Sequence, residues 1–360
     1  MPGLRLFAFG SNGSGQLGVG HNDDLDFPQA VPNLFAPVNQ LAAGGNHTVI
    51  LCSTGELMAT GNNEDGRCGF PEHKELDRFR KIDRPPRHNG QIHGIKQVVA
   101  TWSATIVLCT DGSVFVRGSG SSGELGLGPS VTLASTWRQI AIPCPRQTQV
   151  IRLASGMAHA IAIDSGNECY GWGKGRKGQL GEPTATHVWS PRKIGGISFG
   201  ARVAACGREF SVILGGRCKP EILLLGPNGN DRFGLRANVP SDLSDGIDFD
   251  SSWGSVFAVN SSGAMTGWGR NDHGQLPPSN LPTITAIAAG SEHVLAMSTD
   301  RDVFAWGWGE HGNCGSPTDS NGDVKGSCHK IVLPGLAVNV FAGCATSFVQ
   351  IQEREQDPPE

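Results

Sequence analysis

Short runs of apolar and β-branched residues recur along the chain, separated by glycine-rich or polar turns. Examples are the runs His47–Leu51, Ala104–Leu108 and His159–Ile163. Runs of this length and composition are typical of buried β-strands. The intervening turns, such as Ser53–Glu56 and Thr110–Ser113, favour tight hairpins. The pattern therefore predicts an all-β protein.

One block recurs seven times and has the form of a strand that enters a glycine-rich loop. It reads LFAFGSNGSGQLG from Leu6 and CYGWGKGRKGQLG from Cys169. The spacing between blocks, 38 to 57 residues, is typical of β-propeller blades. Each block has an anchor glycine where the strand must turn sharply, and glycine alone takes a positive φ there without steric cost. The anchor glycines are Gly10, Gly61, Gly118, Gly173, Gly226, Gly269 and Gly307.

A second motif, a turn followed by an apolar strand, precedes six of these blocks and also ends the chain. The chain begins with the block at Leu6 and ends with the turn and strand from Phe341, so each end carries half a repeat. We therefore predict a single seven-bladed β-propeller over residues 1–352, with its ring closed by pairing of the N- and C-terminal strands. Closure removes exposed strand edges. The charged segment 353–360 is predicted to be a disordered tail.

Composition narrows the possible functions. Lys and Arg total 29 against 33 Asp and Glu, for a net charge of −4, so direct nucleic-acid binding is disfavoured. We find no signal peptide and no apolar run long enough to span a membrane. The ten cysteines are scattered without Cys-x-x-Cys pairs, which favours reduced thiols. We expect a protein of the cytoplasm and nucleus.

Three histidines share one position in the repeat. His47, His159 and His293 each lie three residues after a glycine of the turn. They could line a metal site, but equivalent positions in different blades lie far apart, so we expect each ring to hydrogen-bond the backbone of a neighbouring blade. We assign Thr105, Phe210, Val256 and Thr346 to the same position in other blades. This variety of residue types argues against a metal-binding or catalytic role for the position.

The sequence contains no signature of a catalytic centre. We find no Gly-x-Ser-x-Gly elbow, no Cys beside a His in a known arrangement and no His-Glu-x-x-His helix. The acidic loop of Asp23, Asp24 and Asp26 is interpreted as a solvated loop, with binding of a basic partner as the alternative. We therefore predict that the protein is not an enzyme and carries no cofactor of its own.

Loop tryptophans are the best candidates for a binding surface. Trp308 replaces the small or polar residue that follows the anchor glycine in other blades, and Trp102 and Trp253 occupy turns where we align glycine in other blades. A loop tryptophan that projects outward is a typical interface anchor, whereas local packing is the alternative. The predicted partner-binding residues are Trp308, Glu310, His311, Asn313, Trp102 and Trp253.

The glycine-rich blocks and their preceding turns resemble the regulator-of-chromosome-condensation repeat family of seven-bladed propellers, over residues 4 to 351. The opening FAFGSNGSGQLGVG, the block WGWGEHGNCG and the closing AGCATSF are similar to one fungal branch, the alpha-tubulin suppressor or killer-toxin-insensitivity propellers. That resemblance implies a non-enzymatic heterodimer with the small CSL-type zinc protein of diphthamide synthesis. It further implies support of diphthamide formation on translation elongation factor two and, indirectly through Elongator, of tRNA wobble-uridine modification. Zinc or iron would then belong to the partner.

Two other classes of function stay open. The family's founding member is a guanine nucleotide exchange factor for a small GTPase, and the sequence does not exclude exchange. An enzyme on the axial face of the propeller is the other possibility, although no convergent acid, base or metal-ligand set occurs at equivalent positions of the blades.

Overall fold

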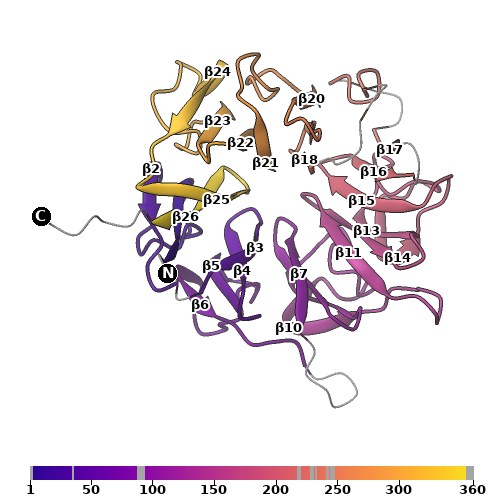
Figure 1. Ribbon diagram of the computed structural model, residues 1–360. Helices are drawn as coiled ribbons and strands as arrows, with labels where there is room; N and C mark the ends of the chain where they lie inside the picture. Colours follow the sequence, from indigo (N-terminus) through magenta and orange to yellow (C-terminus); the bar gives the residue numbers. More distant parts are fainter. Residues whose placement is uncertain are drawn as a thin grey trace, which may run out of the picture.

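The computed structural model describes residues 3–34, 36–86, 94–216, 220–227, 231, 233–240, 243 and 248–353. Within these ranges the chain forms seven antiparallel β-sheets arranged as blades around a central axis, which confirms the predicted all-β, seven-bladed propeller (Figure 1). Five blades have four strands and two have three among the described residues.

The blades follow one another along the chain. The first contains β3 (Val38–Ala43), β4 (His47–Cys52), β5 (Leu57–Asn62) and β6 (Glu75–Lys81). The second contains β7 (Ile95–Ala100), β8 (Ala104–Cys109), β9 (Val114–Ser119) and β10 (Leu133–Ile140). The third contains β11 (Val150–Ser155), β12 (His159–Asp164), β13 (Cys169–Lys174) and β14 (His187–Lys193).

The remaining blades include the two with three strands. The fourth contains β15 (Ala201–Cys206), β16 (Ser211–Gly215) and β17 (Glu221–Leu225). The fifth contains β18 (Asp248–Ser251), β19 (Ser255–Val259) and β20 (Met265–Gly269). The sixth contains β21 (Ile284–Ala289), β22 (His293–Ser298), β23 (Val303–Trp308) and β24 (Asp323–Ile331). The closing blade contains β25 (Gly335–Ala342), β26 (Thr346–Glu353), β1 (Leu4–Gly10) and β2 (Leu25–Ala30).

The closing blade joins the two ends of the chain. β1 pairs antiparallel with β26 in seven consecutive registers, from Leu4 with Gln352 to Gly10 with Thr346, and this confirms the predicted closure of the ring. An ion pair between Arg5 and Glu353 (2.7 Å) lies at the end of this pairing. β26 ends at Glu353, the first residue of the predicted tail, and the rest of that tail lies outside the described residues.

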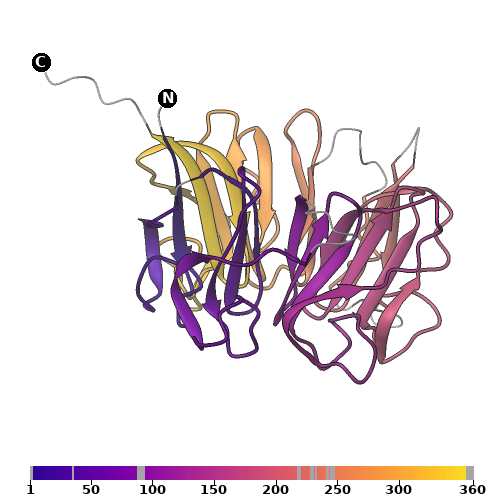
Figure 2. The same ribbon diagram turned by 90° about the horizontal axis from the view of Figure 1, so that it is seen from below.

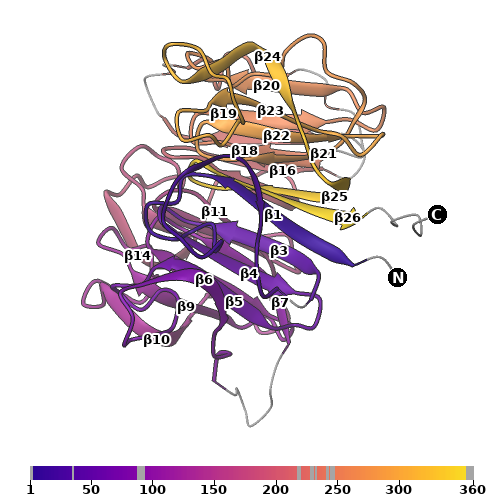
Figure 3. The same cartoon turned by 90° about the vertical axis from the view of Figure 1, so that its left-hand side faces the viewer.

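Strand direction separates the two faces of the ring. In each blade the first strand lies at the axis, and the turn to the second strand opens on the same side as the glycine-rich loop after the third strand. We call this side the loop face. β1 begins and β26 ends on the opposite side, the terminal face, where both ends of the chain emerge (Figures 2 and 3). All six predicted partner-binding residues belong to turns or loops of the loop face, or to the strand end that enters them.

The core lies within and between the blades. The second strands β4, β8 and β12 are buried at every residue, because each is flanked by strands of its own blade and by the neighbouring blades. Trp172 and Trp306 occupy equivalent positions and are fully buried. The indole N–H of each donates to a backbone carbonyl of the preceding blade, Glu124 for Trp172 and Gln275 for Trp306 (both 2.9 Å). A buried indole N–H is usually hydrogen-bonded, and here the preceding blade supplies the acceptor.

The anchor glycines meet the conformational demand expected from the sequence. All seven have positive φ, for example +100° at Gly61 and +105° at Gly307. A Cβ at Gly307 would lie 2.6 Å from the Glu292 carbonyl oxygen of the neighbouring strand turn. The position therefore excludes a side chain for two reasons, the backbone conformation and the space.

Candidate functional site

The three repeat histidines form hydrogen bonds between blades. Nε2 of His159 lies 2.8 Å from Oγ of Ser211 in the next blade, and that hydroxyl donates to the Gln179 carbonyl (2.8 Å). Since the hydroxyl proton is used on the carbonyl, Ser211 must accept from Nε2–H, which fixes the tautomer of the neutral ring. His47 with Thr105 (3.1 Å) and His293 with Ser347 (2.9 Å) repeat the arrangement. We call these three arrangements the hydroxyl latches.

The latches correct two sequence expectations. Each histidine bonds to a side-chain hydroxyl of the neighbouring blade rather than to its backbone. The strand registers also place Ala104 and Ser255, not Thr105 and Val256, opposite the anchor glycines of their blades. The assignment of these two positions from the sequence is therefore wrong by one residue, because these two turns lack the glycine that marks the others.

In the correct register, each imidazole or phenyl ring at this position meets a residue of matching polarity in the next blade. Each histidine opposite an anchor glycine contacts a residue of the next blade that carries a hydroxyl. Phe210 lies opposite the anchor glycine of the fourth blade, and the corresponding contact residue in the fifth blade is Val256. Ala104 is followed in the same way by Ala160. Polar rings therefore meet polar partners and apolar rings meet apolar ones, which satisfies or avoids buried hydrogen-bonding groups.

Burial keeps the latch histidines neutral. Desolvation lowers the pKa of His159 and of His293 to about 4. Burial, followed by the nearby Arg67 charge, lowers the pKa of His47 to about 3. The three rings belong to three separate blade junctions and each has its own hydroxyl partner. They therefore form structural contacts rather than one site.

The turn glycine before each ring makes room for it. A Cβ at Gly290 would lie 2.2 Å from Cε1 of His293, and one at Gly207 would lie 2.1 Å from the Phe210 ring. The turns before the small residues Ala104 and Ser255 carry Thr101 and Ser252 instead. Glycine therefore precedes the histidine by three residues because the imidazole ring occupies the space of a Cβ, and not because the backbone needs a positive φ there.

A series of backbone hydrogen bonds joins the tips of successive turns on the loop face, from the first blade to the closing blade. N–H of Trp102 donates to the Met157 carbonyl (2.8 Å) and N–H of Trp253 donates to the Ser291 carbonyl (2.9 Å). The equivalent tip positions of the other blades hold Gly45, Met157, Arg208, Ser291 and Cys344, which corrects the expectation of glycine at most of them.

The side chains of Trp102 and Trp253 meet across the propeller axis. They belong to the second and fifth blades, yet their ring centroids are 5.8 Å apart with an interplanar angle of 39°. Trp102 is 38% exposed, one of the few large apolar side chains in the described part of the chain with such exposure. The guanidinium of Arg208 lies 5.9 Å from the Trp253 ring. The structure therefore brings two of the predicted site residues together.

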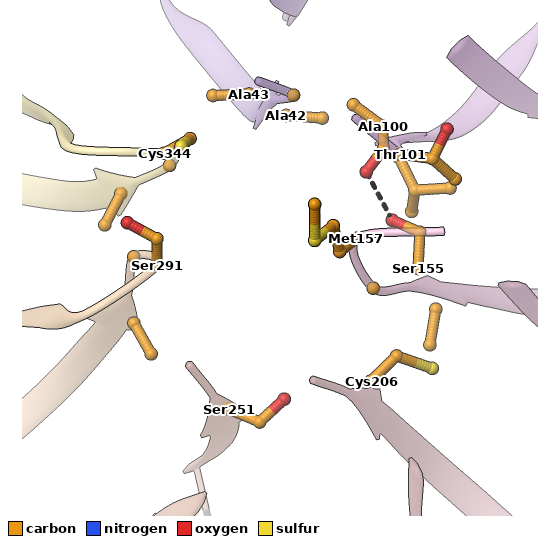
Figure 4. Close-up of a pocket in the computed structure, with 18 of the residues that line it drawn as sticks. Ala42, Ala43, Ala100, Thr101, Ser155, Met157, Cys206, Ser251, Ser291 and Cys344 are labelled. Carbon is orange, nitrogen blue, oxygen red and sulfur yellow. Dashed lines mark hydrogen bonds between the residues drawn. The ribbon is translucent and has the colours of Figure 1, made fainter. Parts of the chain in front are cut away.

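The two tryptophans border a cavity of about 320 Å³ that follows the axis. Its walls come from the axial strands of all seven blades and are mostly small side chains, such as Ala43, Ala100 and Ser251 (Figure 4). Met157 extends toward the middle, and Ser155 donates to the Ala100 carbonyl of the preceding blade (2.8 Å). Asp250 is the carboxylate in this wall, and burial raises its pKa to about 6.

Trp308 forms a second aromatic cluster farther from the axis. Its ring is half-buried between two imidazoles, with centroid distances of 5.4 Å to His311 and 6.3 Å to His273. Each imidazole is held by a carboxylate at 2.8 Å, His311 by Asp24 and His273 by Asp323. Trp308 and His311 therefore lie together, and Asp24 is part of the cluster rather than of a merely solvated loop.

Glu310 and Asn313 have different surroundings. Glu310 is exposed beside this cluster. Asn313 is fully buried, and its amide donates to the Trp308 carbonyl (2.7 Å). Asn313 thus shapes the loop below Trp308, which corrects the expectation that it contacts a partner directly.

Sequence reasoning missed a charged network next to Trp308. Arg270 pairs with Asp272 (2.6 Å) and with Glu292, and the amide of Gln275 donates to Glu292 (2.9 Å). Desolvation raises the pKa of the Glu292 carboxyl. These residues lie in the glycine-rich loop of the fifth blade and the tip turn of the sixth, so only the junction between blades brings them together.

Within the described ranges, no group of three or more His, Cys, Asp or Glu side chains is placed to hold a metal ion. The nine described cysteines are all unpaired. No helix of the described chain is long and apolar enough to cross a membrane.

Comparison with known families assigns the chain to a class. The RCC1-like domain model matches residues 5–349, and the chain therefore belongs to the RCC1-like propeller family. The RCC1 repeat-containing protein C10F6.04 of Schizosaccharomyces pombe is 30% identical over 98% of this chain and 100% of its own. The mouse secretion-regulating guanine nucleotide exchange factor is also 30% identical, over 88% of this chain and 76% of its own.

Solved structures agree on the fold. Prp20p of Saccharomyces cerevisiae superposes with a TM-score of 0.84 at 22% identity, over 99% of this chain and 93% of that one. Human WBSCR16 superposes with a TM-score of 0.81 at 19% identity, over 98% and 99%. At such identities the likeness concerns the architecture alone.

Proposed function

We propose that this RCC1-like propeller is a non-enzymatic docking protein whose loop face binds another protein. The observation that carries the proposal is the Trp102–Trp253 pair, since two large rings held at the centre of one face, with Trp102 38% exposed, match the usual composition of a binding hot spot. Trp308 lies on the same face. Tryptophan anchors contribute much apolar area and need little ordering on binding.

The partner we propose is the small CSL-type zinc protein of diphthamide synthesis. The support is the resemblance of three sequence stretches to the fungal branch described above. In this proposal the heterodimer acts in the cytoplasm and nucleus, and any zinc or iron belongs to the partner. The propeller would cover part of the partner and so control which electron donor or acceptor it meets. Diphthamide synthesis and, indirectly, Elongator-dependent tRNA modification would depend on the complex.

A binding titration of the purified full-length propeller with the purified zinc-loaded CSL protein tests this proposal. We expect a one-to-one complex that the double variant Trp102→Ala/Trp253→Ala weakens by about thirtyfold or more, the loss of about 2 kcal/mol expected for a true hot spot. Trp189→Ala is the matched control, because Trp189 is also a half-buried tryptophan but lies on outer strand β14. Absence of binding by the wild-type protein would exclude this partner.

Nucleotide exchange on a small GTPase is the second candidate. The 30% identity to a mouse protein named as a guanine nucleotide exchange factor favours it. Release of a fluorescent GDP analogue from purified GTPases, followed with and without the propeller, tests this function. Acceleration that depends on propeller concentration would move exchange ahead of docking.

A further inference from the structure

Four cations lie together on one side of the loop face. Lys174, Arg176 and Lys177 belong to the glycine-rich loop of the third blade, and Arg208 is the tip residue of the fourth. Arg176 and Arg208 are exposed, and Lys174 and Lys177 are half-buried. We call these four residues the basic arc.

The basic arc is continuous with the axial tryptophans. The carbonyl oxygens of Lys177 and Glu209 both lie within 3 Å of the point where a Cβ on Gly226 would be. The loop that carries Lys177 and the turn that carries Arg208 therefore adjoin at Gly226. The next contact leads to the axis, because N–H of Arg208 donates to the Trp253 carbonyl (3.0 Å) and its guanidinium lies over the Trp253 ring. Trp253 in turn contacts Trp102. A single surface thus runs from Trp102 to Arg176.

Among the described residues, no carboxylate pairs with the charges of the basic arc. None of its four side chains forms an ion pair with a described carboxylate, whereas two other arginines of the loop face do, Arg67 with Asp65 (2.6 Å) and Arg270 with Asp272 (2.6 Å). Two carboxylates are placed beside the arc, Glu209 next to Arg208 in the chain and Glu124 near Lys174. Burial raises the pKa of the Glu124 carboxyl, and the charge of Lys174 only partly opposes this increase. The two carboxylates leave an excess of positive charge in a protein whose net charge is −4.

We infer that this surface binds an acidic segment of a partner protein that also carries apolar side chains. Carboxylates of the segment pair with Arg176, Lys177 and Arg208, and an apolar side chain packs on Trp102 and Trp253. Arginine suits this use because its guanidinium can stack on an aromatic ring and bind a carboxylate at the same time. The inference rests on the proposed docking role of the loop face and adds the chemistry of what is docked.

Fluorescence anisotropy of labelled probes with the full-length protein tests the inference. The first probe is a twelve-residue peptide of Asp and Glu alternating with Leu and Phe, and the second is the same peptide with Lys in place of the acids. The third is a single-stranded RNA of twelve nucleotides. We expect binding of the acidic peptide alone, weakened by added salt, since the exposed cations are screened. Lys174→Glu/Arg176→Glu/Lys177→Glu should weaken it by about tenfold or more, since like charges then face each other.

A matched variant controls for net charge and folding. Arg146→Glu/Arg152→Glu/Arg202→Glu reverses the same number of charges, on three exposed cations outside the loop face, and should bind the acidic peptide as the wild-type protein does. Arg208→Lys keeps the charge and should weaken binding less than Arg208→Ala.

The outcomes separate the inference from the proposed function. No binding of the acidic peptide, equal loss in both triple variants, or preferred binding of the RNA would each overturn the inference. Failure of the docking proposal is measured separately, as absence of binding to the purified CSL protein. If that protein binds and neither triple variant weakens it, docking stands and the basic arc is not its contact.

Discussion

Replacing His159 with Phe and Ser211 with Val at the same time tests whether a hydroxyl latch makes the fold sensitive to acid. The pair Phe210 and Val256 already occupies the equivalent positions one blade further on, so the two new side chains have a precedent in the same protein. A substitution that keeps volume and packing in this way costs less than about 1.5 kcal/mol at pH 7. Ser211→Val alone leaves N–H of the buried His159 unsatisfied and should cost about 1–3 kcal/mol.

The sign of the pH effect follows from the lowered pKa. Burial lowers the pKa of His159 from 6.5 to about 4 in the folded protein. Below pH 6.5 the unfolded chain therefore takes up a proton that the folded protein does not, and the stability present above pH 6.5 is lost as pH falls toward 4. Between pH 7 and pH 5 this residue alone should lower the free energy of unfolding by about 2 kcal/mol.

Urea unfolding at pH 7 and pH 5, followed by tryptophan fluorescence, measures this difference. The wild-type protein should lose about 2 kcal/mol more between the two pH values than the double variant does. His187→Phe is the control, because His187 is a partly exposed residue of an outer strand and takes no part in a latch. If the double variant loses as much stability as the wild-type protein, the neutral buried state of His159 is refuted.

Three further predictions concern space, buried charge and binding. Gly290→Ala places a Cβ 2.2 Å from the ring of the latch histidine and should lower the free energy of unfolding by about 2 kcal/mol or more, whereas Gly195→Ala, with open space around it, should be nearly neutral in the same urea assay. Arg117→Met removes a fully buried guanidinium that donates to two backbone carbonyls, and a loss of about 3 kcal/mol or more is expected; a loss below 1 kcal/mol would contradict this account. Trp308→Ala should keep the unfolding midpoint within about a few degrees and weaken partner binding by about thirtyfold, as measured by titration against the Trp189→Ala control; unchanged binding would remove Trp308 from the docking surface.

Several parts of the site were predictable because they depend on local chemistry. A loop tryptophan after an anchor glycine is visible in the repeat alignment, and its proximity to His311, three residues later in the same loop, follows from short chain distance. The burial of Asn313 was not predictable in this way. It depends on how the loop folds back under Trp308, and an amide that bonds its own loop looks the same in sequence as one that faces a partner.

The contacts between blades lay beyond the sequence for a different reason. Trp102 and Trp253 are separated by two blades along the chain, and only the curvature of the closed ring brings their rings to 5.8 Å. Thr105 and Val256 were assigned to the histidine position, which Ala104 and Ser255 in fact occupy, because the turns before these two residues lack the glycine that a larger ring requires.

The sequence by itself determined the number of blades, the closure of the ring and the positions of the sharp turns. These follow from repeat spacing, from half repeats at the two ends and from glycines that take a positive φ, all of which are properties of single segments. Tertiary structure alone decided which loops share a face, which histidines meet hydroxyls and where positive charge stays unpaired beside the axial tryptophans. Such features depend on contacts between residues of different blades, and their distances are set by how seven twisted sheets pack around one axis.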